Sequence, residues 1–194
     1  MKKKAIIVSI KGTILTRKES KLLSNEKPWG LILFKRNISS LDQIKSLIRK
    51  IKKLTKDNNF PILIDEEGST VSRLKDLINH DVSAKYFGNL YIENKNLCIK
   101  LYKIYLSSLC KNLKHIGINV NTIPVLDVLR KNTNKVINNR GFSKNQEIVK
   151  KLGNITINQC HSSKIISVIK HIPGHGLAKV DSHHLTPTIN KDLK

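Results

Sequence analysis

Residues 61–73 read Pro-Ile-Leu-Ile-Asp-Glu-Glu-Gly-Ser-Thr-Val-Ser-Arg. The first four residues form a short apolar run, which is typical of a buried strand in a parallel sheet. The run stops at three carboxylates, Asp65, Glu66 and Glu67, and at Gly68. The segment therefore predicts a buried strand that ends at chemically active side chains, and the fold is predicted from further segments of this kind.

Four further apolar runs resemble this one, and amphipathic segments separate them. The runs cover residues 5–10, 30–34, 118–125 and 165–169. Capping boxes between them predict helices that begin after Thr16, Ser40 and Ser143. Five alternations of strand and helix predict a parallel α/β fold with right-handed crossovers.

A long amphipathic helix is predicted over Asn94–Ile116, between the third and fourth apolar runs. Its apolar residues recur at helical spacing, so we expect one face to be buried against the sheet. The side chains expected to point inward are those of Leu97, Leu101, Ile104, Leu109 and Leu113.

Two architectures fit this alternation, a doubly wound sheet and a (β/α)₈ barrel. A dinucleotide-binding sheet carries a Gly-x-Gly-x-x-Gly turn after its first strand, but only Lys11-Gly12-Thr13 follows Ile10. Barrel enzymes place functional residues at the carboxyl ends of many strands. Polar residues do follow the apolar runs here, namely Arg36, Asp65, Asp127, Lys170 and His171. We therefore predict a TIM-type barrel.

The net charge of +22 comes from 36 basic and 14 acidic residues. Lysine supplies 30 of the basic residues, and Lys, Ile and Asn are the amino acids that AT-rich codons specify. Base readout favours arginine, and single strands need aromatic stacking platforms, whereas aromatic residues make up only 5% of this chain. We therefore expect no nucleic-acid partner, and a basic nucleic-acid-binding protein stays the less favoured alternative.

A cytoplasmic location is expected from two features. No apolar stretch approaches the roughly 18 residues that a membrane span needs, and the run at 5–10 is too short for a signal peptide. The three cysteines, Cys98, Cys110 and Cys160, are widely spaced and form no Cys-x-x-Cys motif, which fits a reducing compartment. No membrane partner is therefore expected.

Four separated segments carry a more specific signal. They are Pro28–Asn37 (PWGLILFKRN), Asp65–Arg73 (DEEGSTVSR), Asn121–Val128 (NTIPVLDV) and Lys170–Gly176 (KHIPGHG), the last followed by Asp181-Ser182-His183. Together and in this order they resemble glycoside hydrolase family 3. The patterns they resemble are G-x-ILF-x-RN, D-x-E-G-G-x-V-x-R, APVLDV and KH-[FI]-PGHG…DSH. The last pattern marks the bacterial cytoplasmic β-N-acetylhexosaminidase branch.

The resemblance implies hydrolysis of terminal β-linked N-acetylglucosamine from peptidoglycan-derived muropeptides, with retention of configuration and no cofactor or metal. It makes His183 the acid/base and Asp181 its partner on a mobile loop. Asp181 could orient the imidazole of His183 and raise its proton affinity. The residues implied to bind the sugar substrate are Asp65, Arg73, Arg140, Lys170 and His171.

Three departures from the family pattern stand out. Ser69 replaces a glycine, which would strain a turn that needs a positive φ. Arg140 keeps the family's arginine but follows Asn139 where an acidic residue is usual. The family's nucleophilic Asp lies on a later strand, and Asp192 lacks the pattern that surrounds it.

We therefore interpret residues 1–194 as a truncated N-terminal barrel domain with about the first five of eight βα units. Its open sheet edges predict a poorly stable or aggregation-prone chain. The alternatives are an inactive sugar-binding remnant and half of a split enzyme, which a C-terminal chain would complete.

Simpler interpretations exist for several of these residues. Glu66 and Glu67 could be solvated loop charges or could support the site, and Asp127 could cap a loop or orient its neighbours. A metal site is a less favoured interpretation of the His-rich loop, because its spacing is not His-Glu-x-x-His. The residues that invite this interpretation are His171, His175, Asp181, His183 and His184.

Overall fold

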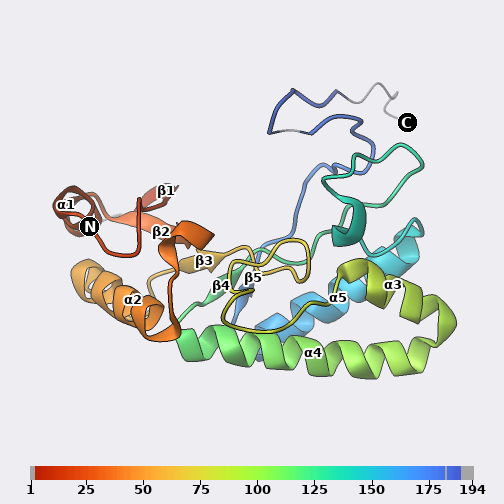
Figure 1. Ribbon diagram of the computed structural model, residues 1–194, viewed down its shortest axis with the longest axis horizontal. Helices are drawn as coiled ribbons and strands as arrows, with labels where there is room; N and C mark the ends of the chain where they lie inside the picture. The colour runs from red at the N-terminus through yellow and green to blue at the C-terminus, as the bar shows by residue number, and fades with distance from the viewer. Residues whose placement is uncertain (1–2, 182, 189–194) are drawn as a thin grey trace.

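The computed structural model describes residues 3–181 and 183–188 (Figure 1). The strands are β1 (Lys4–Val8), β2 (Pro28–Leu33), β3 (Ile62–Ile64), β4 (Val120–Asn121) and β5 (Ile166–Ser167). The helices are α1 (Arg17–Glu26), α2 (Leu41–Thr55), α3 (Ala84–Glu93), α4 (Lys95–Ile116) and α5 (Gln146–Ser162). Two 3₁₀ turns, η1 (Lys35–Asn37) and η2 (Asn138–Arg140), lie in the connections.

The strands form one parallel sheet in the order β1-β2-β3-β4-β5. Leu31 pairs with Ile62, and Leu63 pairs with Val120, so the middle of the sheet is in continuous register. The predicted α/β fold with a parallel sheet is therefore confirmed. The predicted strand over 118–125 is wrong in length, because regular pairing is confined to Val120–Asn121, with one further bridge from Val125 to Lys170.

The helices begin largely where side-chain caps predicted. Thr16 and Glu19 form a reciprocal capping box, and the hydroxyl of Ser40 accepts from the N–H of Gln43. The third predicted cap is wrong, because α5 is capped by Asn145, whose side chain accepts from the N–H of Glu147. Helix α3 was not predicted, because its apolar pattern is short and directly adjoins α4.

The buried face of α4 differs from the predicted one. Leu109 and Leu113 are buried as expected, but Leu97, Leu101 and Ile104 are exposed. Tyr102 replaces them in the core, where it packs on Phe87 and Phe142. The hydroxyl of Tyr102 forms a 2.7 Å hydrogen bond with Thr156, so this hydroxyl is paired although it is buried. The buried face of α4 therefore combines leucines with Tyr102 and with the cysteines Cys98 and Cys110.

The two outer strands lie at the edges of the described sheet, as predicted, and are less buried than their apolar runs alone suggest. Ile6 and Ile7 on β1 and Ile166 on β5 are each about half exposed, whereas Leu31, Leu33 and Ile64 in the middle of the sheet are fully buried. Each outer strand has one neighbouring strand among the described residues. The apolar pattern alone does not distinguish a strand at an edge of the sheet from one in the middle.

Figure 1 shows where the sheet places its loops. Helix α4 runs along the bottom of the view, and the segments that follow β4 and β5 rise on the opposite side, above α3 and α5. In the described part of the chain, no helix combines the length and the apolar character needed to cross a membrane.

Candidate active site

A cleft of about 510 Å³ lies beside the segments that follow β3, β4 and β5. It is lined by all five predicted sugar-binding residues, Asp65, Arg73, Arg140, Lys170 and His171, and by His183. The residues come from distant parts of the sequence, and the parallel strands bring them to one edge of the sheet.

Asp65 follows β3 directly and is held by three neighbours. Thr122 donates to one of its carboxylate oxygens at 2.6 Å, and Arg73 donates to the other at 3.0 Å. Lys170 lies 3.4 Å from Asp65 and donates to the hydroxyl of Thr122 at 2.8 Å. Burial would raise the pKa of Asp65, but the Thr122 hydrogen bond and the charges of Lys170 and Arg73 together hold it below its usual value. Asp65 is therefore an ionised acceptor for sugar hydroxyls.

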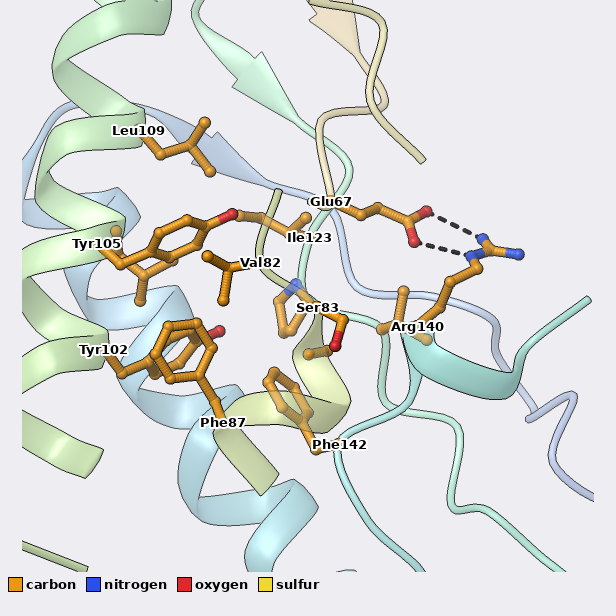
Figure 2. Close-up of a pocket in the computed structure, with 14 residues that line it drawn as sticks. Glu67, Val82, Ser83, Phe87, Tyr102, Tyr105, Leu109, Ile123, Arg140 and Phe142 are labelled. Atoms are coloured by element: carbon orange, nitrogen blue, oxygen red, sulfur yellow. Dashed lines mark hydrogen bonds and ion pairs between the residues drawn. The ribbon is translucent and has the colours of Figure 1, made fainter. Parts of the chain in front are cut away.

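Glu67 contacts two cations of the cleft, and Figure 2 shows its pairing with one of them, Arg140. Its carboxylate accepts two hydrogen bonds from Arg140, at 2.8 and 2.9 Å, and lies 2.5 Å from the ammonium group of Lys170. Burial would lower the pKa of Arg140, but the hydrogen bonds and charge of Glu67 outweigh burial and raise it. Glu67 is thus no solvated loop charge, since it fixes the direction of both basic side chains.

His171 and Asp127 form a second fixed unit. Nδ1 of His171 lies 2.6 Å from the Asp127 carboxylate, and Nε2 lies 3.3 Å from a guanidinium nitrogen of Arg140. Because Arg140 can only donate, Nε2 accepts, and the imidazole carries its proton on Nδ1. Asp127 also accepts from the backbone N–H of His175 at 2.6 Å, which supports the interpretation that Asp127 orients its neighbours.

The predicted pair Asp181 and His183 is formed within one loop. Nδ1 of His183 lies 2.6 Å from Oδ1 of Asp181, and the backbone N–H of His183 donates to the same oxygen at 2.9 Å. These two hydrogen bonds hold the pKa of Asp181 below its usual value. His183 is 73% exposed and lines the cleft, which leaves Nε2 available to a bound molecule. Ser182 and Asp192 lie outside the described residues.

Sequence reasoning missed the role of Thr122. This residue follows β4 directly and lies in the 121–128 segment, but outside the part that matches APVLDV, and it bridges Asp65 and Lys170. The two ring nitrogens of His175 are buried without a hydrogen-bond partner among the described residues. Arg36 lies outside the cleft, because it donates to the carbonyl of Ile10 and its guanidinium lies over the ring of Phe34.

The substituted turn at Ser69 is not strained. The positive φ belongs to Gly68, at 136°, and a Cβ there would lie 2.2 Å from the carbonyl oxygen of Val82. Ser69 itself has no positive φ, so its side chain is accommodated. No cluster of three or more His, Cys, Asp or Glu side chains suited to a metal ion occurs within residues 3–181 and 183–188.

Comparison with known proteins identifies the class of protein that carries such a site. The model of the glycosyl hydrolase family 3 N-terminal domain matches residues 3–194, and the chain belongs to this family. It is 35% identical to β-hexosaminidase A of Pseudoalteromonas piscicida over 187 residues, covering 93% of this chain and 30% of that protein. It is 31% identical to a β-hexosaminidase of Thioalkalivibrio sulfidiphilus, covering 94% of this chain and 52% of that protein.

Among solved structures, the chain is similar to NagZ from Neisseria gonorrhoeae. The TM-score is 0.88 at 29% identity, over 95% of this chain and 54% of NagZ, which has been solved in complex with N-trifluoroacetyl-D-glucosamine. The chain therefore spans about half the length of NagZ and of the Thioalkalivibrio relative, and about a third of the Pseudoalteromonas protein.

Proposed function

We propose that this chain provides the sugar-binding and proton-donating part of a retaining β-N-acetylhexosaminidase. The observation that carries the proposal is the single cleft that combines the Asp181–His183 pair with the network of Asp65, Glu67 and Arg140. Membership of the family and similarity to β-hexosaminidases support it. The substrate is a glycoside with a terminal β-linked N-acetylglucosamine.

In the proposed reaction, His183 donates a proton from Nε2 to the leaving glycosidic oxygen. Asp181 holds Nδ1 and stabilises the positive charge of the imidazolium. Asp65 accepts hydrogen bonds from sugar hydroxyls, while Arg140, Lys170 and Arg73 donate to hydroxyls or to the acetamido carbonyl. A nucleophilic carboxylate from outside residues 1–194 attacks the anomeric carbon as the bond to the leaving oxygen breaks, which forms a glycosyl-enzyme intermediate. The deprotonated Nε2 of His183 then accepts a proton from the water that attacks this intermediate and releases the carboxylate.

We further propose that residues 1–194 are an N-terminal barrel domain with five of the eight βα units of a (β/α)₈ barrel. The remaining units, in the same polypeptide or in a complementing C-terminal chain, supply the nucleophilic carboxylate. They also cover the apolar side chains that β1 and β5 expose. The extent of NagZ, of which this chain covers 54%, supports this arrangement.

A cytoplasmic muropeptide fragment is the substrate class we infer for the complete enzyme. The buried sulfur atoms of Cys110 and Cys160 lie 3.9 Å apart as free thiols, which fits a reducing compartment. Four basic side chains, those of Arg73, Lys135, Arg140 and Lys170, line the cleft against two carboxylates, Asp65 and Glu67. This excess of positive charge fits a substrate that carries carboxylates beyond the sugar.

The test is release of the chromophore from an aryl β-N-acetylglucosaminide by the 194-residue protein, with the His183→Ala variant beside it. Turnover that disappears in the variant supports His183 as the acid/base and contradicts the proposal that the nucleophile lies outside residues 1–194. Binding of N-acetylglucosamine without turnover supports the second candidate, a sugar-binding half-site, which the fully formed network around Asp65 favours. Absence of both would overturn the proposal.

A further inference from the structure

Glu66 lies between two cleft residues but does not line the cleft itself. Its side chain is completely buried, and each carboxylate oxygen has partners. One oxygen accepts from the backbone N–H groups of Arg73, at 2.9 Å, and Leu74, at 3.0 Å. The other lies 2.6 Å from Nε2 of His80. A buried carboxylate that closes a loop in this way is costly to disturb, because each lost partner leaves a buried polar group unpaired.

His80 connects this carboxylate to helix α4. Nδ1 of His80 lies 3.2 Å from the hydroxyl of Tyr105, whose side chain is seen on α4 in Figure 2. Nε2 of His80 faces a carboxylate oxygen, which accepts, and Nδ1 faces a hydroxyl, which can donate or accept. Burial and the negative charge of Glu66 both raise the pKa of Tyr105, so its hydroxyl keeps its proton.

The loop held by Glu66 carries Arg73, which donates to Asp65 in the cleft at 3.0 Å. Nε of Arg73 is buried without a hydrogen-bond partner among the described residues, so few side-chain contacts fix this guanidinium. Its backbone N–H, in contrast, is fixed by Glu66. Glu66 occupies the variable position of the D-x-E motif, so the family pattern does not account for its contact with His80.

We propose that Glu66 and His80 are positioning residues that hold Arg73 in place for sugar binding, with Tyr105 as their anchor on α4. The inference rests on the proposed function, because it assigns Arg73 to the sugar. Neither residue touches the bound sugar in this account. Glu66 acts through the backbone of Arg73, and His80 acts through Glu66.

Three substitutions in the 194-residue protein test the contact of Glu66 with the backbone of Arg73 and the contact of His80 with Glu66 separately. Glu66→Ala removes all the acceptors, so the affinity for N-acetylglucosamine should fall about tenfold. His80→Ala leaves both backbone hydrogen bonds of Glu66, so the loss should be smaller, on the order of threefold. Glu66→Gln should restore most of the affinity, because its carbonyl can accept from both backbone N–H groups while His80 changes tautomer.

The matched control is provided by two tyrosines on the same helix. Tyr105→Phe removes the hydroxyl that contacts His80, and Tyr102→Phe removes a buried hydroxyl that contacts Thr156 instead. Both variants lose one hydrogen bond of a tyrosine hydroxyl on α4, which is part-buried for Tyr105 and buried for Tyr102, so Tyr105→Phe should lose no more stability than Tyr102→Phe. Only Tyr105→Phe should alter the Nε–H signal of Arg73 in the ¹⁵N NMR spectrum, which an Arg73→Lys variant assigns.

Two measurements are made, the sugar affinity by NMR titration and the Arg73 signal. Because the Arg73 signal does not depend on sugar binding, a failure of the inference can be told apart from a failure of the proposed function. A wild-type chain that does not bind N-acetylglucosamine contradicts the proposed function, and the Arg73 signal still decides the positioning role. An Arg73 signal and a sugar affinity that are unchanged in both His80→Ala and Glu66→Ala overturn the inference. Should Glu66→Ala fail to fold, the graded effects of His80→Ala and Tyr105→Phe on the Arg73 signal decide it.

Discussion

Nδ1 of His171 lies 2.6 Å from one oxygen of Asp127, and the other oxygen of this buried carboxylate accepts from the backbone N–H of His175. The carboxylate thus connects a cleft residue that follows β5 with the loop that leads to His183. Two N–H donors converge on two acceptor oxygens, which only an acidic side chain provides.

Asp127→Asn is therefore expected to destabilise the protein. The amide offers one acceptor oxygen and one NH₂ donor, so either an N–H group faces the amide NH₂ or His171 changes tautomer and turns Nε2–H toward the guanidinium of Arg140. The free energy of unfolding should fall by about 1–3 kcal/mol, the usual cost of a buried unpaired donor. Urea denaturation of the variant measures this loss. Asp76→Asn is the control, because the Asp76–Lys35 pair is exposed and should contribute less than about 1 kcal/mol.

The ionisation of Asp127 is also expected to contribute to the loss of stability of the protein at low pH. Burial would raise the pKa of Asp127, but the hydrogen bonds from His171 and the His175 backbone outweigh burial and lower it. The unfolded state therefore binds the proton at a higher pH than the folded state. The stabilisation is complete above the ordinary Asp pKa of about 3.9 and is lost as the pH falls through the folded-state pKa.

Asp127→Asn removes this contribution, so its free energy of unfolding should fall less steeply than that of the wild type between about pH 5 and pH 3. Urea denaturation at a series of pH values measures both slopes. Equal slopes in the two proteins would show that the contacts of Asp127 contribute nothing to acid unfolding.

Removal of Glu67 should cost more than removal of an exposed glutamate. Glu67→Ala leaves Arg140 and Lys170 side by side without their shared carboxylate, in a cleft where Glu67 is only 6% exposed. We expect a loss of about 3–5 kcal/mol in the free energy of unfolding, as for other broken buried pairs.

The control for Glu67→Ala is Glu147→Ala, whose partner Lys150 lies 3.9 Å away on the exposed side of α5. That variant should stay within about 0.5 kcal/mol of the wild type. Thermal and urea denaturation of both variants make the comparison. Similar losses in the two would contradict the role given to Glu67.

Much of the site was predictable because motifs mark residues at strand ends. Asp65, Arg140, Lys170 and His171 share one cleft as the sequence predicted, and His183 pairs with Asp181. Their proposed roles in catalysis remain predictions. What the sequence could not supply is which polar neighbours complete the network.

Thr122 and His80 illustrate this limit. Thr122 becomes a bridge only because the register of β3 and β4 places it beside Asp65. His80 gains its partners from the fold of the 66–80 loop against α4. The inward-pointing side chains of α4 were also predicted incorrectly, because Tyr102 rather than Leu101 lies in the core.

The exposed edge of β5 predicts self-association of the 194-residue protein. Ile166 is 53% exposed on a strand that has one strand neighbour in the described part of the chain, so its free backbone groups and apolar side chain can pair with another copy. Ile166→Lys should raise the monomer fraction in sedimentation velocity, because a charge on an edge strand opposes pairing. Ile92→Lys adds the same charge at an isoleucine that is 68% exposed on α3, where no strand edge exists, and should change the monomer fraction little. An equal gain of monomer in both variants would mean that net charge, rather than the β5 edge, controls association.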